Sequence, residues 1–464
     1  LLPQKQSEVS NPLVVGDVNN DGLEDFFVGN SKDEKAALFI QTKSGNFISS
    51  NKSLFETDKT YEDTDAVFID VDHDNDLDLY VASGGYEVEL NSPLLEDRLY
   101  INNGKGLFKK SKRLPSIQSN TKGVTASDYD NDGDMDIFVG SRVKHGMYPL
   151  SDSSYLLENQ NGKFIDVTEA HFSEISELKM VNDALFTDYD NDGDSDLIIV
   201  GEWMPITIYE NDKSNFKKVS LSELDMLSGW YQTIKEVDLD NDGFKDYIIG
   251  NWGENNKFHP STDKPLHVYA DDFEQNTSFD VILSKVSKTG DLIPVRGKEC
   301  SSQQITSLNS KIKTYKEFAT SNLIDIYGEN ELNSATHLTV TDFQSIILRN
   351  NQNGQFEIKK LPKHAQFSPT LSIETHDFNG DGFLDIFGVG NVFDAEVETI
   401  RYDASKNYVL LGNEKDDFQF INDTSYFNNN EAKAIKKIVI SGQVYFIIMN
   451  KNDSLKILRL KNQS

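Results

Sequence analysis

Several kinds of residue and segment are scarce or missing in this chain of 464 residues. The single cysteine, Cys300, excludes an internal disulfide framework, so stability must come from packing or bound metal. No apolar run approaches the roughly 18 residues that a membrane-spanning helix needs. No signal peptide is visible, and the chain opens at Leu1 without Met, as a processed or truncated segment does.

Positive charge is also in short supply. Lys and Arg number 45 against 76 Asp and Glu, which gives a formal net charge of −31. This excess argues against nucleic acid or an anionic membrane as partner. Hydrophobic residues make up 37% of the chain, with 28 Phe and 18 Tyr. That content is enough for a packed core and excludes wholesale disorder.

The sequence also lacks the common motifs of catalytic sites. The chain contains no phosphate-binding loop and no nucleophile elbow, and its eight His show no HExxH or other paired-ligand spacing. The histidines are therefore interpreted as structural or exposed.

The acidic residues recur in a nine-residue pattern, best seen at residues 128–136 (DYDNDGDMD). Carboxylates fall at positions 1, 3, 5 and 9, and an apolar run, 137–139, follows. Like charges this close repel, so the folded loop needs a cation, and oxygen ligands favour calcium over zinc or copper. Gly133 at position 6 permits the positive-φ turn that folds the loop around an ion. Position 7 would add a backbone carbonyl.

The same pattern returns along the chain. Good copies begin at Asp17, Asp70, Asp188, Asp238 and Asp377, and Asn75 replaces Gly in the second loop, which Asn tolerates. A seventh copy at 272–280 (DFEQNTSFD) is degenerate. His73 lies inside the second loop and is expected to point outward. Repetition in register makes a solvated acidic turn a poor explanation.

Around each loop the chain repeats one order of short strands. In the third unit these are predicted at 123–126, 137–140, 155–159 and 163–167. Four short antiparallel strands in about 50 to 60 residues are typical of a propeller blade. The sequence therefore predicts an all-β fold, a seven-bladed β-propeller over residues 1–464, with eight blades as the alternative.

Two segments depart from the repeat. Residues 286–335 exceed one unit, and apolar residues within 310–326 follow helical spacing, so a short helical insertion is predicted within blade six. Residues 430–464 give strands without a loop. They are expected to close the ring with the N-terminal strand or to form an eighth blade.

The motifs GDVNNDGLEDFFVG, SDYDNDGDMDIFVG, TDYDNDGDSDLIIVG and HDFNGDGFLDIFGVG resemble FG-GAP/VCBS repeats. These repeats build integrin α-subunit heads and secreted propellers similar to cartilage acidic protein. VRGKECSSQQ (295–304) and AQFSP (365–369) further resemble long surface VCBS-repeat proteins of Bacteroidota, which often carry an upstream propeller behind a lipoprotein anchor. The resemblance implies a calcium-binding propeller and does not choose between adhesion, assembly and sugar binding.

Resemblance and spacing together imply about six or seven structural Ca²⁺ sites. Their side-chain ligands would be Asp17, Asn19, Asp21 and Asp25; Asp70, Asp72, Asp74 and Asp78; Asp128, Asp130, Asp132 and Asp136; Asp188, Asp190, Asp192 and Asp196; Asp238, Asp240, Asp242 and Asp246; Asp272, Glu274, Asn276 and Asp280; and Asp377, Asn379, Asp381 and Asp385. The 272–280 set departs from the pattern, because Thr277 stands where Gly belongs.

The end of the propeller opposite the loops is the candidate binding face. Residues just before a first strand or just after a second strand lie there, and all three tryptophans are in such places. We expect a concave, aromatic and polar mouth formed by Tyr86, His145, Trp203, Trp230, Trp252 and Phe393. The alternative is that the tryptophans plug the channel or pack between blades.

The leading functional hypothesis is a non-enzymatic, calcium-stabilised binding or scaffolding propeller. Its partners would be other surface or outer-membrane proteins, or glycans, and its place the cell surface of a Gram-negative bacterium or the medium. A carbohydrate-active lyase is the alternative; its candidate acid–base residues are Arg142, Lys144, Glu202, Glu254, Glu396 and Arg401. A pure spacer is a third, weaker hypothesis.

Overall fold

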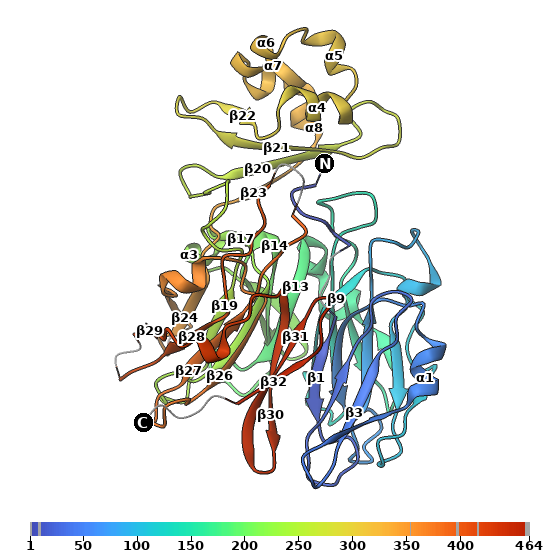
Figure 1. Cartoon of the computed structure of the whole chain (residues 1–464). Coiled ribbons are helices and arrows are strands. Elements are labelled where there is room, and N and C mark those ends of the chain that lie inside the picture. Colours follow the sequence, from blue (N-terminus) through green and yellow to red (C-terminus); the bar gives the residue numbers. More distant parts are fainter. Residues whose placement is uncertain (1, 8–10, 353, 396–398, 415–416, 460–464) are drawn as a thin grey trace.

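A computed structural model describes residues 2–7, 11–352, 354–395, 399–414 and 417–459. Within them the chain forms eight antiparallel sheets. Seven of these sheets stand around one axis as blades, and the eighth lies beyond one end of that axis (Figure 1).

Each blade runs outward from its first strand. The strands of the seven blades, in order, are β1 (Leu13–Gly16), β2 (Asp25–Val28), β3 (Ala37–Gln41) and β4 (Phe47–Ser50); β5 (Asp63–Ile69), β6 (Asp78–Ser83), β7 (Arg98–Ile101) and β8 (Lys109–Lys110); β9 (Thr121–Ser127), β10 (Asp136–Ser141), β11 (Tyr155–Asn159) and β12 (Phe164–Asp166); β13 (Met180–Thr187), β14 (Asp196–Pro205), β15 (Thr207–Asp212) and β16 (Asn215–Val219), with β17 (Ser228–Trp230) beside β14; β18 (Thr233–Val237), β19 (Asp246–Gly250), β24 (Ile346–Asn350) and β25 (Phe356–Lys360); β26 (Ser372–His376), β27 (Asp385–Val389), β28 (Tyr408–Leu411) and β29 (Gln419–Phe420); and β30 (Ala432–Ile440), β31 (Gln443–Asn450) and β32 (Lys456–Leu458).

The innermost strands close a ring. Contacts run β1–β5, β5–β9, β9–β13, β13–β18, β18–β26, β26–β30 and from β30 back to β1. The predicted all-β propeller of seven blades is thereby confirmed, and the eighth sheet is no member of the ring. Residues 432–458 form the last blade as a sheet of their own, next to β1 rather than paired with it.

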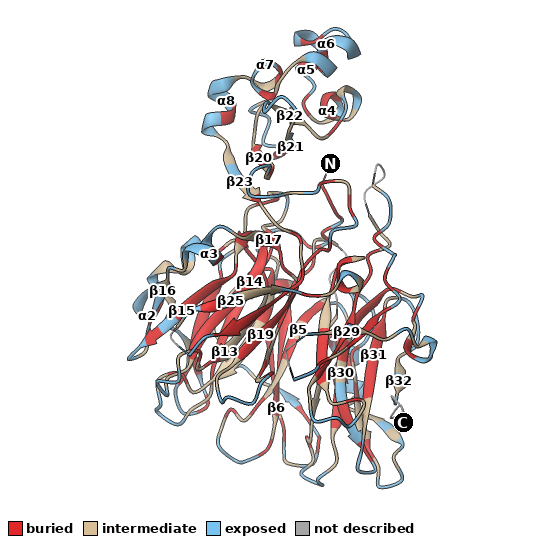
Figure 2. Cartoon of the chain, turned by 90° about the vertical axis from the view of Figure 1, so that its left-hand side faces the viewer, coloured by how far each residue is buried: buried red, intermediate tan, exposed pale blue. Residues whose placement is uncertain are grey.

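The second strand of each blade is packed on both faces, which is why its sequence is a continuous apolar run. In β10 every residue is buried, whereas the outer strand β8 is exposed. Figure 2 shows this burial concentrated in the propeller strands. The glycine that ends such a run allows the next blade to approach: a Cβ on Gly140 would lie 2.4 Å from Val181 Cγ1.

Short helices lie outside the blades or in the insertion. They are α1 (Lys52–Thr57), α2 (Thr168–His171), α3 (Ser222–Asp225), α4 (Lys298–Gln304), α5 (Leu308–Lys311), α6 (Tyr315–Thr320), α7 (Leu323–Tyr327) and α8 (Glu329–Ser334), with the 3₁₀ turns η1 (Pro93–Leu95), η2 (Ser173–Glu177), η3 (Lys363–Gln366) and η4 (Thr424–Tyr426). Among the described residues, none of these helices has the length and apolarity to cross a membrane.

The insertion is larger than predicted and lies in a different blade. The chain leaves the fifth blade after β19, forms β20 (Leu266–Asp271), β21 (Asp280–Val286), β22 (Leu292–Pro294), α4–α8 and β23 (Thr336–Val340), and returns as β24. The placement within blade six, over 286–335 only, is therefore corrected. The acidic copy at 272–280 joins β20 to β21 of a separate four-stranded sheet and does not belong to a blade of the ring.

This inserted domain has its own small core. Ile282, Ile305, Phe318 and Ile326 are buried between its sheet and its helices. The opposite face of the sheet packs on the propeller, at the end away from the acidic loops (Figures 1 and 2).

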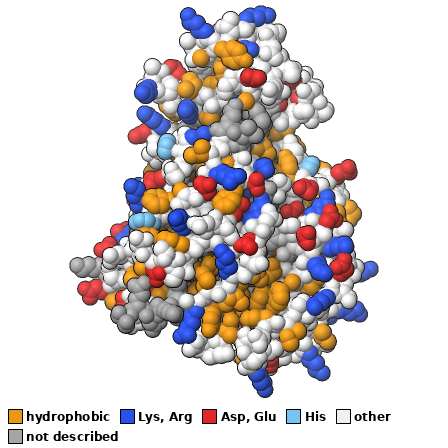
Figure 3. Space-filling view, in the orientation of Figure 1, with side chains coloured by type: hydrophobic (Ala, Val, Ile, Leu, Met, Phe, Trp, Pro, Cys, Tyr) orange, Lys and Arg blue, Asp and Glu red, His pale blue; other side chains and the backbone are white. Residues whose placement is uncertain are grey.

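The side of the propeller seen in Figure 3 carries charges of both signs and one area of hydrophobic side chains low on the face. That area lies where Figure 1 draws the seventh and first blades. The seventh sheet has three strands, so part of this inter-blade core, including Tyr445 and Phe47, is only partly buried.

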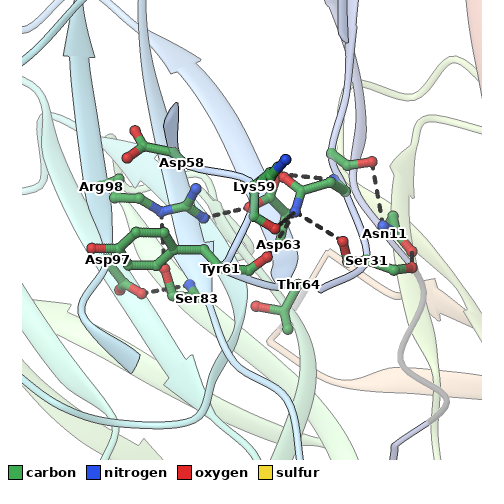
Figure 4. Close-up of polar contacts among 12 residues, drawn as sticks. Asn11, Ser31, Asp58, Lys59, Tyr61, Asp63, Thr64, Ser83, Asp97 and Arg98 are labelled. Carbon is green, nitrogen blue, oxygen red and sulfur yellow. Dashed lines mark hydrogen bonds and ion pairs between the residues drawn. The ribbon is translucent and has the colours of Figure 1, made fainter. Parts of the chain in front are cut away.

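Buried polar contacts tie neighbouring blades together. Arg98 on β7 forms an ion pair with Asp63 on β5 (Figure 4). The other oxygen of Asp63 accepts the backbone amide of Asn30, from the first blade, at 2.9 Å. Both side chains of the pair are at most 3% exposed, so each charge depends on the other.

Candidate functional site

Six acidic loops join the first and second strands of blades one to six. Because all six connections leave the same strand end, the loops lie together at one end of the propeller. Carboxylate oxygens converge within 4.8 Å of one another in four of them, among the described residues: Asp70, Asp72 and Asp74; Asp128, Asp130 and Asp136; Asp188, Asp190, Asp192 and Asp196; Asp238, Asp240 and Asp246.

Loop three shows how the backbone folds around its carboxylates. The Gly133 amide donates to Asp128 Oδ2 at 3.0 Å, with Gly133 at φ +99°. The amides of Asp132 and Asp134 donate to Asp130 Oδ1 (3.1 Å) and Asp132 Oδ1 (2.8 Å). These short-range bonds hold one oxygen each of Asp128, Asp130 and Asp132, and carboxylate oxygens of Asp128, Asp130 and Asp136 lie within 4.8 Å of one another.

The aspartate at position 9 has a second role that the sequence did not reveal. Asp136 is fully buried and accepts the Tyr129 amide (3.4 Å) and the Asn159 amide (2.8 Å), the latter from the third strand. The same pair of backbone donors reaches position 9 in every loop: Val18 and Gln41 to Asp25, Val71 and Asn102 to Asp78, Tyr189 and Asn211 to Asp196, Leu239 and Asn350 to Asp246, Phe378 and Gly412 to Asp385.

Several loop oxygens fit a cation because nothing else satisfies them. Asp70 Oδ1, Asp72 Oδ1, Asp76 Oδ1 and Asp128 Oδ1 are buried and receive no hydrogen bond from the described residues. Asp76 is 4% exposed. Buried, unpaired carboxylate oxygens are costly, and a hard divalent ion is the partner that suits them.

Electrostatics point the same way. Burial, and then the charge of neighbouring carboxylates, raises the pKa of Asp136 to about 8 and the pKa of Asp78 and Asp196 to about 7. A divalent ion among these side chains would restore the charged form.

The degenerate copy does not match the other six. Asp272 accepts the Asn276 and Thr277 amides, and Glu274 turns away to the Ser307 amide (2.7 Å) and the Thr306 hydroxyl. Because Glu274 is engaged with the helices of the inserted domain, this loop lacks the convergence seen in the ring.

Asparagines at the third-strand ends tie blades two to five each to the blade before it. Their side-chain amides donate to the position-2 carbonyl of the preceding loop: Asn102 to Val18, Asn159 to Val71, Asn211 to Tyr129 and Asn350 to Tyr189, at 2.6 to 2.9 Å. In blade one Gln41 reaches Val439 of the last blade (3.0 Å). The recurrence of Asn after the third strand was a visible signal for this contact.

Position 4 links neighbouring loops. Asn20, Asn131 and Asn191 each donate to the next loop, at 3.3 to 3.4 Å. His73 is exposed, as expected, and its Nε2 lies 2.5 Å from Asp134 Oδ1 of loop three.

The described residues do not form the expected open mouth. Trp203, Trp230 and Trp252 are at most 3% exposed and form one cluster with the inserted sheet, including Leu266 and Val268. Trp230 contacts both other tryptophans with ring centroids 5.4 Å apart. The tryptophans are a plug on which the inserted domain is seated, so the prediction of a partner-binding mouth is wrong for them.

The other three residues of the predicted mouth, Tyr86, His145 and Phe393, are half-buried. The Tyr86 hydroxyl accepts the Gly146 amide at 3.1 Å, and its ring lies 4.9 Å from the His145 ring. The Phe393 ring lies under Arg401, with 5.7 Å from the guanidinium carbon to the ring centroid.

The N-terminal segment also covers the axis. Gln4 Nε2 donates to Glu202 Oε2 at 2.8 Å, and Glu202 Oε1 is 3.1 Å from Arg142. Both members of that ion pair are buried. Two of the lyase candidates therefore neutralise each other beneath the chain's own N-terminal residues.

The remaining lyase candidates are dispersed. Lys144 is half-buried, Glu254 accepts a bond from Gln344 at 2.5 Å, and Arg401 lies over Phe393. Glu396 lies outside the described residues. The structure does not bring these residues together into one acid–base site.

Comparisons with known proteins agree with this picture. The family described as FG-GAP-like repeat matches residues 17–81, 90–139 and 188–249, which contain loops one to five. No curated protein sequence matches the chain.

Solved structures give similarities at low identity. A lectin from Agrocybe aegerita, described as recognising non-reducing terminal N-acetylglucosamine, has 15% identity and a TM-score of 0.47, over 98% of this chain and 94% of that one. YCF48 from Cyanidioschyzon merolae has 9% identity and a TM-score of 0.41, over 96% and 94%. The V. cholerae biofilm matrix protein Bap1 has 9% identity and a TM-score of 0.36, over 97% of this chain and 86% of that one.

Proposed function

Because this chain is a β-propeller of FG-GAP-like repeats, we propose that it is a calcium-stabilised binding or scaffolding module that works outside the cytoplasm. The observation that carries the proposal is the repetition of one oxygen-only loop in six blades, together with buried carboxylate oxygens in loops two and three that receive no donor from the described residues.

Calcium would be structural in this proposal. In loop three, Asp128, Asp130, Asp132 and Asp136 would hold the ion, which would neutralise charge that otherwise repels. The loops lie at the blade turns, and side chains at position 4 link loops one to five in series, so ion binding would stiffen this part of the ring.

An extracytoplasmic location suits such loops, because millimolar calcium outside cells fills sites of moderate affinity. On this proposal the chain belongs to a bacterial surface assembly, of the kind that the Bacteroidota resemblance implies, or is secreted. Its partners would be other surface proteins or glycans. With the tryptophans covered, a partner would dock on the inserted domain or on the half-buried residues Tyr86, His145 and Phe393.

Removal of calcium tests the structural part. Thermal melting of the wild-type chain with 2 mM calcium and with EGTA is expected to differ strongly, since a ligand at about 100 times its Kd adds about 2.7 kcal/mol per site. Asp128→Ala combined with Asp188→Ala should reduce the difference. Equal melting in both conditions, with no calcium retained after desalting, would refute it.

The binding part needs a separate measurement. The intact chain, immobilised, is probed with an array of purified glycans and with a surface-protein fraction, in calcium and in EGTA. We expect saturable, calcium-dependent binding of at least one defined component, lost in the double variant. Turnover of a glycan, rather than retention, would instead support the lyase alternative.

A further inference from the structure

One residue of the fifth blade stands where a metal ion is expected. Arg349 comes directly before Asn350, whose amide donates to Asp246, the position-9 aspartate of loop five, at 2.9 Å. The residues that hold the same place before the position-9 donor in the other blades are Ile40, Ile101, Glu158, Glu210 and Leu411. Only in blade five is this residue a cation.

The guanidinium of Arg349 reaches into loop five. One nitrogen pairs with Asp246 Oδ2 and another with Asp240 Oδ2, so the group joins positions 9 and 3 of the loop. The side chain is 8% exposed. A planar fork between two carboxylates is the geometry that arginine favours, and the group keeps its proton in proteins.

The oxygens of loop five are fully used. Asp238 accepts the Asp242 and Gly243 amides, Asp240 accepts the Asp242 amide and Arg349, and Asp246 accepts the Asn350 and Leu239 amides and Arg349. Asp242 accepts the Phe244 amide (2.8 Å) and Gln352 Nε2 (2.7 Å). Each of the eight side-chain oxygens thus has a donor from the described residues.

In loops one and six every ligand side-chain oxygen also has a donor among the described residues, but these donors are backbone amides and one asparagine side chain in each loop, and none is charged. The charged donor is therefore what distinguishes loop five from them.

Loops two and three, by contrast, keep oxygens without a donor from the described residues. Loop two also meets an arginine, since Arg113 donates to Asp72 Oδ2 at 2.8 Å. That side chain is 41% exposed, and Asp70 Oδ1 and Asp72 Oδ1 still lack a donor. The single exposed contact of Arg113 therefore leaves carboxylate oxygens of loop two without a donor. In loop five the buried guanidinium of Arg349 pairs with two carboxylates at once.

We propose that the Arg349 guanidinium takes the place of the calcium ion in loop five, so that this loop is closed without metal. The inference rests on the proposed calcium role of the other loops. Calcium requires six to eight oxygens, and here those oxygens already face a fixed positive charge that would repel the ion. Loops three and four carry Glu158 and Glu210 in the same place and remain metal sites.

The position of Arg349 in the fifth blade indicates what its ion pairs stabilise. Blade five is the one interrupted by the inserted domain, so β24 must return to β19 after a long excursion of the chain. Arg349 lies on the returning strand, Asp240 lies on the loop before β19, and Asp246 is the first residue of β19. The ion pairs therefore hold the returning strand to its blade at any calcium concentration.

Counting bound calcium by native mass spectrometry tests the inference. Asp130→Ala in loop three is expected to lower the wild-type count by one, and Asp240→Ala, its counterpart in loop five, to leave it unchanged. Arg349→Gln is expected to raise the count by one at millimolar calcium. Adding Asp240→Ala to Arg349→Gln should remove that extra ion.

Melting of Arg349→Gln provides a second readout and a check of folding. In EGTA this variant should melt below the wild type, and saturating calcium should restore most of the difference. A wild-type count that falls on Asp240→Ala, or a folded Arg349→Gln chain with an unchanged count, would overturn the inference while leaving calcium binding intact. A wild-type chain without calcium at any loop would refute the proposed function and this inference together.

Discussion

Truncating Trp230 should separate the inserted domain from the propeller before it unfolds either one. This side chain is fully buried, and its ring packs against Trp203, Trp252, Phe258 and Phe343 with centroids 4.8 to 5.7 Å apart. The cluster also contains the inner face of the inserted sheet, so the contacts belong to the interface between the two parts.

The size of the effect follows from burial. Replacing a fully buried Trp by Ala costs about 3 to 5 kcal/mol, and each lost aromatic pair accounts for about 0.5 to 1.5 kcal/mol of such an effect. With four aromatic partners, Trp230→Ala is expected at the upper end of that range. Because the loss falls at the interface, protection of β20–β23 from hydrogen exchange should decline more than protection of β10.

Intrinsic fluorescence is a direct assay, because all three tryptophans of the chain lie in this cluster. In Trp230→Ala the two that remain should emit at longer wavelength and show a lower urea midpoint. Met226→Ala is the control: this side chain is 60% exposed close to β17, and its loss should change stability by no more than about 0.5 kcal/mol. An unshifted spectrum and midpoint in Trp230→Ala would refute the packing argument.

Two further outcomes are expected. Asn211→Ala leaves the Tyr129 carbonyl without its 2.7 Å donor and should cost about 1 to 3 kcal/mol in urea unfolding. Asn215→Ala, at the exposed start of the outer strand β16, should cost little. Equal costs for the two variants would contradict the inter-blade role. Burial, and then the charge of His337, lowers the pKa of His267 to about 4, so between pH 6.5 and pH 4 the unfolded chain binds the proton first and stability declines as pH falls. His267 Nδ1 lies 2.9 Å from His337 Nε2. His267→Gln should flatten the dependence of the melting temperature on pH between pH 6.5 and pH 4. A profile parallel to that of the wild type would show that His267 does not cause the loss of stability.

The sequence was a reliable guide wherever one unit repeats. Runs such as 137–139 have the burial of a strand packed on both faces, and the acidic loops have one spacing in six blades, so the blade and its loops could be predicted. Where a unit is interrupted, the pattern misled. Residues 272–280 resemble an acidic loop in sequence. Because of this likeness, the sequence predicts the insertion in the sixth blade, whereas it lies in the fifth.

What the sequence by itself determined is local: strand periodicity, turn chemistry and clustered charge need only neighbours within about ten residues. The tertiary structure decided what joins residues far apart. It paired Arg349 with Asp246, a loop residue 103 positions earlier. It placed the Asn211 side chain against the Tyr129 carbonyl of the preceding blade, and it covered the three tryptophans with a sheet from the same chain. These contacts depend on how the ring closes and on where the inserted domain is seated, and neither leaves a periodic trace in the sequence.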